Sequence, residues 1–407
     1  MKHILIFSYW FPPANVIGAS RPAEVARYFA AQGWKVTVVC GASKASSLDY
    51  LPDLTGISVY PVEDTTITRL GSFAPNRGTV SRYFGAALRL IAIPDIYRSV
   101  ISRMVAKARK VCEGQNRPDV IFSTALPFSS HIGARVLARE FGSIFVADNR
   151  DVWALSPYRR ILPAYRPFEQ AYERRILKSA HLVTAISQGM IDYFSASYPE
   201  INERMLVVRN GVDIRKPIVS KPKGRTSLGH AKGLELVYTG ILYGTRRNIS
   251  ALLEATGSID HPVRFNFFGA ESWRLAELSK LYPLAGIADC GRVTREKALE
   301  VQRSADALVI SVGTDKMESF FLPGKFFEYV GSGRPIIAVA DPESELGKLI
   351  SKYGLGIASL NSKEISHFLS ELANKRVPTR KDVPEELTRK FQLSILEQKI
   401  VSLLATK

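Results

Sequence analysis

The residues whose types and spacing best suit a binding or catalytic site lie in the run Leu322–Tyr329. Pro323 predicts the first turn of a helix, where its missing N–H costs nothing, and Gly331 and Gly333 predict the end of that helix. The N-terminus of a helix presents free N–H groups and a partial positive charge to the loop before it. This spacing therefore predicts an anion site.

Lys325 and Glu328 lie three residues apart and share one face of the predicted helix. A cation for phosphate beside a carboxylate for hydroxyl groups suits a sugar nucleotide. The alternative is a surface ion pair, which has little functional meaning.

The elements that must position this helix alternate along the whole chain. Ser20 is expected to cap a helix with Pro22 in its first turn and Gly33 at its end. Continuous apolar runs predict strands buried on both faces, at 4–7, 35–40, 120–123, 144–147, 182–185, 205–208, 234–238, 264–268, 285–289, 307–310 and 336–339. The order predicts two doubly wound, Rossmann-like α/β domains with ligands at the carboxyl ends of the strands, in a cleft between the domains.

The composition changes after residue 213, where Lys, Pro, Gly and Ser replace apolar periodicity. We expect a first domain at 1–213, a linker at 214–233, a second domain at 234–385 and a C-terminal helix at 386–407 that returns to the first domain. The 407 residues carry a net charge of +17, which favours anionic partners. No apolar run is long enough for a transmembrane helix, and three scattered cysteines fit a reducing cytoplasm.

Several blocks of sequence together resemble the retaining, two-domain (GT-B fold) glycosyltransferases of group 1, also called family 4. The resemblance spans nearly the whole chain, in the order FPPANVIGASRPAEVARYFAAQGWKVTVV, TAISQGM, VRNGVD, YTGILYGTRRNISALLEA, GRVTREKALEVQRSADALVISV and LPGKFFEYVGSGRPII. It implies that the second domain binds a nucleotide-diphospho-sugar and the first binds an acceptor. The expected activity is that of a hexosyl- or related glycosyltransferase.

The resemblance also assigns roles to individual residues. Lys325 falls near the donor phosphates in a PSKxFEY-like motif, Glu328 at the ribose hydroxyls, and Val293 beside the base. Glycines that let the backbone approach the phosphates match Gly240 and, in the first domain, Gly18. The expected donor-binding set is Gly18, Gly240, Arg246, Arg247, Val293, Pro323, Gly324, Lys325 and Glu328.

This sequence departs from the family pattern at three places. Many members carry a glutamate eight residues before Glu328, where this chain has Phe320, and Glu318 is out of register. Gly324 stands where serine is common. A histidine often follows the fourth strand, and the nearest one here is His131, which either faces the cleft or caps a helix.

The expected chemistry is transfer with retention by attack on the front face of the sugar, which needs no protein nucleophile. Arg247 and Lys325 are expected to stabilise the leaving nucleoside diphosphate, with Arg246 as support. Neither a cofactor nor a metal ion is expected.

Polar residues after the strand at 144–147 are candidates for acceptor contacts. Arg150 and Asp151 contact the acceptor or form a structural ion pair, and Trp153 is a sugar platform or a core residue. Basic and aromatic residues at 82–110 and 158–178 suit an interfacial helix on an anionic membrane, or an ordinary helix hairpin. No nucleic-acid partner is expected, because charge without a motif is insufficient.

These observations favour a cytoplasmic enzyme, peripheral on the inner face of the plasma membrane, in bacterial-type surface polysaccharide or glycolipid synthesis. Two alternatives remain at this point: a GT-B sugar-nucleotide epimerase, and a degenerate partner subunit that only binds sugar nucleotides.

Overall fold

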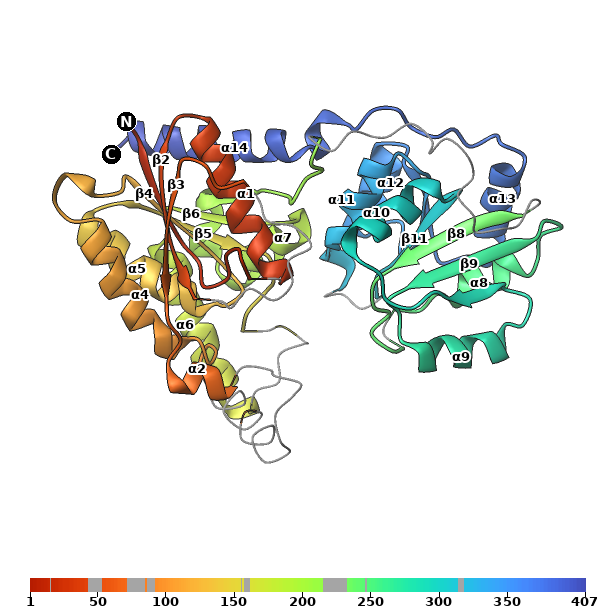
Figure 1. Cartoon of the computed structure of the whole chain (residues 1–407), viewed down its shortest axis with the longest axis horizontal. Coiled ribbons are helices and arrows are strands. Elements are labelled where there is room, and N and C mark those ends of the chain that lie inside the picture. The colour runs from red at the N-terminus through yellow and green to blue at the C-terminus, as the bar shows by residue number, and fades with distance from the viewer. Residues whose placement is uncertain are drawn as a thin grey trace. The chain divides into compact units, whose positions relative to one another are not determined.

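The computed structural model describes residues 1–14, 16–42, 53–71, 85, 92–154, 156, 162–214, 233–245, 247–313 and 318–407. They form two compact units, shown in Figure 1. The first unit contains Met1–Val208 and Leu393–Lys407, and the second unit contains Arg209–Gln392. Most of the linker expected at 214–233, and residues 82–84 and 86–91 of the basic stretch, lie outside the described residues.

The first unit is built on a seven-stranded sheet, whose pairings are all parallel, in the order β3-β2-β1-β4-β5-β6-β7. Residues of the central strands are buried, as expected for strands covered on both faces. The strands are β1 (His3–Phe7), β2 (Lys35–Gly41), β3 (Ile57–Val62), β4 (Val120–Thr124), β5 (Ile144–Asn149), β6 (Leu182–Ala185) and β7 (Met205–Val207).

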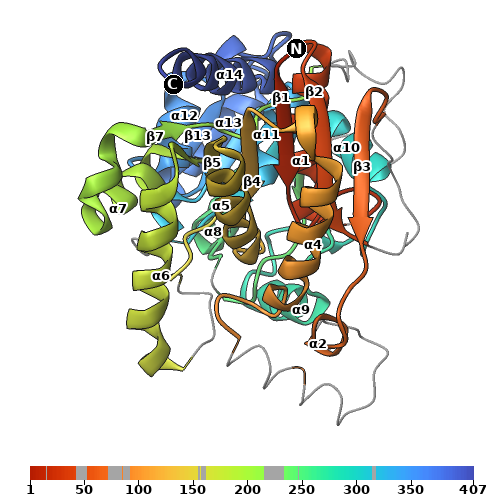
Figure 2. The same ribbon diagram turned by 90° about the vertical axis from the view of Figure 1, so that its left-hand side faces the viewer.

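Helices cover both faces of this sheet. Figures 1 and 2 show α4 and α5 side by side on one face, with α1 on the other. The C-terminal helix α14 packs beside α1, where Leu396 and Ile400 join the core and Glu397 accepts hydrogen bonds from Tyr28 and Trp34. The helices are α1 (Ile17–Ala31), α2 (Thr66–Gly71), α4 (Arg98–Val111), α5 (Ser129–Phe141), α6 (Arg166–Ser179), α7 (Gln188–Ser197) and α14 (Arg389–Ala405).

The second unit repeats the design with a six-stranded sheet, again with parallel pairings, in the order β10-β9-β8-β11-β12-β13. Its strands are β8 (Leu234–Thr239), β9 (Val263–Phe268), β10 (Ile287–Asp289), β11 (Ala307–Ser311), β12 (Ile336–Val339) and β13 (Gly356–Ser359). Separate apolar clusters pack α10 (Arg295–Ser304), α11 (Gly324–Ser332) and α12 (Glu345–Lys352) on one face, and α8 (Ser250–Thr256), α9 (Ser272–Leu281) and α13 (Ser362–Ala373) on the other. The predicted pair of doubly wound α/β sheets is confirmed.

One predicted helix start is wrong, and one predicted helix end is confirmed at Gly333 but not at Gly331. Helix α1 begins at Ile17 with Val16 as its N-cap, so Ser20 lies inside the helix rather than capping it. With this earlier start Pro22 lies inside the helix, where it has no N–H to donate to the Gly18 carbonyl. Helix α11 continues through Gly331 to Ser332, and Gly333, at φ 71°, provides the left-handed cap.

Candidate functional site

The loops at the carboxyl end of the second sheet are lined by glycines with positive φ. Gly240, at φ 103°, follows β8 and donates its N–H to the Phe268 carbonyl at 2.7 Å. Gly269, at φ 85°, follows β9, and a Cβ added to it would lie 3.8 Å from the Gly240 backbone. Both positions have a positive φ that residues with side chains rarely adopt, and glycine leaves the backbone there open to a ligand.

The side chain of Lys325, in the first turn of α11, extends to Gly240 at this end of the sheet. Its Nζ lies 3.7 Å from the centroid of the Tyr238 ring and 3.4 Å from the position of a Cβ added to Gly240. The nitrogen is buried and has no hydrogen-bond partner among the described residues. Burial, reinforced by nearby Arg247, lowers the pKa of Lys325 well below its usual range. A buried ammonium without a partner is costly, and a bound anion would remove that cost.

The start of α11 adds backbone donors to the same place. Pro323 is the N-cap, one position before the first turn, and Gly324 is the first helical residue. A Cβ added to Gly324 would meet nothing within 4 Å, so the helix start is open. The free N–H groups of this turn and Lys325 therefore favour the same negative charge.

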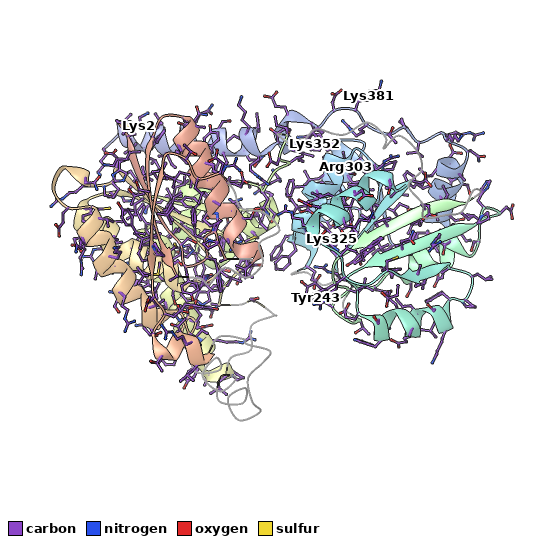
Figure 3. The ribbon with its side chains drawn as sticks, in the orientation of Figure 1. Lys2, Tyr243, Arg303, Lys325, Lys352 and Lys381 are labelled. Carbon is purple, nitrogen blue, oxygen red and sulfur yellow. The ribbon has the colours of Figure 1, made fainter. Side chains whose placement is uncertain are left out.

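Arg247 contributes a second cation from the loop after β8. Its guanidinium carbon lies 4.5 Å from the centroid of the Tyr243 ring, and it donates to the Ile241 carbonyl at 3.4 Å. Figure 3 labels Lys325 and Tyr243, which lie along the same side of the second unit. Arg246, the other expected cation, lies outside the described residues.

Glu328 lies one turn after Lys325 and forms an ion pair with a neighbouring helix, not with Lys325. Its Oε1 accepts from Arg295 Nη2 at 3.1 Å, in a pair that is partly exposed. The surface ion pair that was the alternative for this helix therefore forms with Arg295 of α10. Val293 lies just before α10 and its side chain is 37% exposed, so a ligand can reach it.

Phe320 occupies a buried turn at Glu318–Phe320 rather than an open sugar contact. Glu318 is also buried, and its Oε2 accepts the Gly313 N–H at 2.7 Å.

In the first unit, Gly18 lies in the first turn of α1. A Cβ added there would be 3.2 Å from Trp10 Cδ1 and 3.4 Å from Arg150 Nη2. The position is tighter than most side chains tolerate, so glycine allows Trp10 and Arg150 to approach the helix start.

A buried ion pair that the sequence pattern did not indicate joins α1 to the sheet. Arg21 Nε and Nη2 donate to the Asp148 carboxylate at 2.8 and 2.6 Å, and Thr124 and Thr184 donate to the same group. Burial raises the pKa of Asp148, but Arg21 and the two hydroxyls outweigh it and hold that pKa below its usual range. Arg21 is one of two arginines in this helix, so the sequence alone does not select it.

His131 lies inside α5, fully buried, and does not cap it. Its Nδ1 lies 2.7 Å from Ser123 Oγ, and Nε2 has no hydrogen-bond partner in the described parts of the chain. Burial lowers the pKa of His131 to about 4, so the ring is neutral at pH 7.

The candidate acceptor-binding residues around the end of β5 differ in how deeply they are buried. Arg150 Nε donates to the Ala125 carbonyl at 2.6 Å, and Asp151 is half-buried. Among the described residues no hydrogen-bonded ion pair joins them, although the charge of Asp151 favours the charged form of Arg150. Trp153 is buried and stacks on Phe128 with centroids 5.0 Å apart. Trp153 is thus placed as a core residue, one of its two expected positions.

Neither a metal-ligand cluster nor a membrane-spanning helix is present in the described ranges. No group of three or more His, Cys, Asp and Glu side chains gathers as metal ligands there. None of the helices in those ranges is long and apolar enough to cross a membrane.

Comparison with known proteins finds a family for the first unit and a fold for the whole chain. Residues 20–216, most of the first unit, match the family model Glycosyltransferase Family 4. This stretch, just under half of the chain, is similar to the glycosyltransferases of that family. A search of curated proteins finds no match.

Solved structures of the GT-B fold resemble this chain along its whole length. HepE from Anabaena, in complex with UDP, is 16% identical over 100% of both chains, with a TM-score of 0.64. Sucrose-phosphate synthase from Thermosynechococcus elongatus is 13% identical over 100% of both, with a TM-score of 0.62. The apo lipopolysaccharide outer core galactosyltransferase WaaB is 13% identical over 99% of this chain and 100% of its own, with a TM-score of 0.58. Identities this low establish the shared fold alone.

Proposed function

We propose that this chain is a glycosyltransferase that transfers a sugar from a nucleotide-diphospho-sugar to an acceptor, with retention of configuration at the anomeric carbon. One observation carries the donor assignment. The side-chain nitrogen of Lys325 is buried beside Gly240, and it has no hydrogen-bond partner among the described residues. Arg247 adds a second cation and α11 adds free N–H groups. A diphosphate supplies the charge that this arrangement lacks. HepE, which shares the fold, was solved with UDP and with UDP-glucose.

In the proposed reaction, the bond between the anomeric carbon and the terminal phosphate oxygen breaks, and the nucleoside diphosphate leaves with the electron pair. Lys325 and Arg247 stabilise the charge that develops on the leaving phosphate. The acceptor oxygen attacks the same face, and its proton passes to the leaving phosphate. Glu328 gives up its ion pair with Arg295 and accepts hydrogen bonds from the ribose hydroxyls of the donor.

The direct test is turnover of a panel of nucleotide sugars by the purified chain. Lys325→Met keeps much of the side-chain volume and removes the charge, so we expect turnover to fall by about 100-fold or more, the usual effect of removing one charge-stabilising group. Lys297→Met is the matched control, because Lys297 is an exposed cation paired with Glu300, and it should leave turnover unchanged. Wild-type turnover by the Lys325 variant would contradict the donor site.

The products separate the remaining possibilities. NMR of the glycoside should show the anomeric configuration of the donor, and an inverted product would overturn retention. Release of a free epimerised sugar without acceptor would identify an epimerase. Nucleotide-sugar binding without any turnover would identify a binding subunit, the alternative that the buried Phe320 supports best.

We further propose a lipid-linked or surface-polysaccharide acceptor, used at the inner face of the plasma membrane in bacterial-type glycolipid or polysaccharide synthesis. Support comes from the first unit, where α4 carries Arg98, Arg103, Lys107, Arg109 and Lys110 but no carboxylate. On the neighbouring helix α6, Glu169 and Glu173 are buried while Arg174, Arg175 and Lys178 are exposed. Phe168 of α6 is 69% exposed. Exposed cations beside an exposed aromatic residue suit an anionic lipid surface.

A further inference from the structure

The loop that carries Gly240 and Arg247 is held by a carboxylate from the next β-α connection. Glu271, the N-cap residue of α9, accepts the Leu242 N–H with Oε2 at 2.9 Å and the Gly244 N–H with Oε1 at 3.0 Å. Both oxygens therefore engage backbone on either side of residue 243. Hydrogen bonds from backbone N–H groups to a carboxylate are stronger than those between neutral groups.

The residue between these two contacts has an unusual backbone conformation. Tyr243 has φ 57°, in the left-handed region that residues other than glycine rarely occupy because it is strained. Gly244, at φ 64°, continues the turn. The two hydrogen bonds to Glu271 close around this turn and offset the cost of its backbone conformation.

The turn determines where the ring of Tyr243 lies, and the ring lies against Arg247. The guanidinium carbon is 4.5 Å from the ring centroid, a favourable cation–π distance. Arg247 also donates to the Ile241 carbonyl, which accepts from Tyr238 Oη at 2.9 Å. The Tyr238 ring in turn lies 3.7 Å from Lys325 Nζ. A continuous series of contacts thus connects the Glu271 carboxylate to both cations of the donor site.

We propose that Glu271 is a positioning residue for recognition of the donor diphosphate, acting through Tyr243 to hold Arg247 beside Lys325. The proposal rests on the proposed function, since it concerns the same site. It assigns to Glu271 no contact with the ligand. Its effect should therefore depend on Arg247 being present.

The test is a double-mutant cycle on nucleotide affinity, measured by calorimetry with UDP, GDP, ADP and dTDP and with the corresponding monophosphates. Glu271→Ala should weaken binding of the preferred diphosphate by about tenfold and of its monophosphate by much less. Glu271→Gln keeps the side-chain size and one acceptor oxygen but places an NH2 donor against the other backbone N–H, so it should restore only part of the affinity. In an Arg247→Ala background, Glu271→Ala should have almost no further effect, because coupled residues are not additive.

Glu277→Ala is the matched control, because Glu277 lies on the same helix and pairs with Arg274. It should bind the diphosphate as the wild type does. A full tenfold loss from Glu271→Ala in the Arg247→Ala background would overturn the proposal, as would equal losses for diphosphate and monophosphate. If the wild-type chain binds none of these nucleotides, the proposed function itself fails. If it binds and turns over donor but the cycle is additive, only the role of Glu271 fails.

Discussion

At the scale of single residues, the chain buries several ionisable groups, and the contacts of each suggest its role. Lys325 is buried without a hydrogen-bond partner in the described residues, which points to a ligand. Glu173 of α6 is buried with partners: it accepts the N–H groups of Trp153 and Ala154 at 3.3 and 3.2 Å and the Tyr198 hydroxyl at 2.8 Å. Glu173 thus has a structural role, holding the segment after β5 that contains Arg150.

Glu173 should make the stability of the first unit depend on pH. Burial, with a smaller contribution from the charge of Glu169, raises the pKa of Glu173 to about 7. The folded state therefore holds this proton more tightly than the unfolded state does. The resulting stabilisation is fully present below the unfolded pKa of about 4.5, and is lost as the pH rises through 7.

Glu173→Gln removes this dependence, because glutamine stays neutral. Relative to the wild type, its free energy of unfolding should rise between pH 4.5 and pH 8 by up to about 3 kcal/mol, the linkage value for a shift of this size. Denaturant unfolding at the two pH values measures the difference. His131, whose pKa is lowered to about 4, affects both proteins equally and cancels. A difference that does not change with pH would contradict the assignment.

At the scale of elements, the basic face formed by α4, α5 and α6 is distinct from the donor site. Arg139 of α5 and Arg175 and Lys178 of α6 are exposed and have no ion-pair partner in the described chain. On the same face Arg109 and Arg174 are paired with Glu140 and Glu200. The three cations without such partners add positive charge that these pairs do not neutralise, so they repel one another. An anionic surface would relieve that repulsion.

Changing Arg139, Arg175 and Lys178 together to Gln should weaken binding to vesicles of phosphatidylcholine and phosphatidylglycerol by about 100-fold, since each cation contributes about 1 kcal/mol at such a surface. The same change at Lys363, Lys375 and Lys381, exposed residues of the second unit, is the control and should leave binding unchanged. Vesicle flotation at low salt measures both. Absence of wild-type binding, or equal losses in the two triple variants, would contradict the membrane proposal.

The sequence predicts elements well where burial on both faces produces continuous apolar runs, as in β1, β4 and β6. It misses β3, which contains Pro61 and has no continuous apolar run like those of the buried strands. The structure places β3 at the edge of the sheet, where a proline is tolerated. The start of α1 was also wrong, because Ser20 is a good cap by type but the helix begins at Ile17.

At the scale of the whole molecule, the repeated β-α order was sufficient to predict two α/β halves, and the motif near residue 325 was sufficient to propose a donor site. The buried contacts were not predictable. The Arg21–Asp148 ion pair joins residues far apart in the sequence. The hydrogen bonds from Leu242 and Gly244 to Glu271 join two successive β-α connections. No local sequence pattern indicates either contact. Such pairs depend on strand order, which brings carboxyl ends of different strands together.

The central claim is that Lys325 binds the donor diphosphate, and calorimetry of nucleoside diphosphate binding at pH 8 tests it most directly. Because burial lowers the pKa of Lys325 in the free protein, binding an anion should raise that pKa and take up part of a proton, detected by comparing buffers of different ionisation enthalpy. Affinity should fall as pH rises. Lys325→Met should lose tenfold or more in affinity and lose the proton uptake. Unchanged affinity and unchanged uptake in this variant would contradict the account.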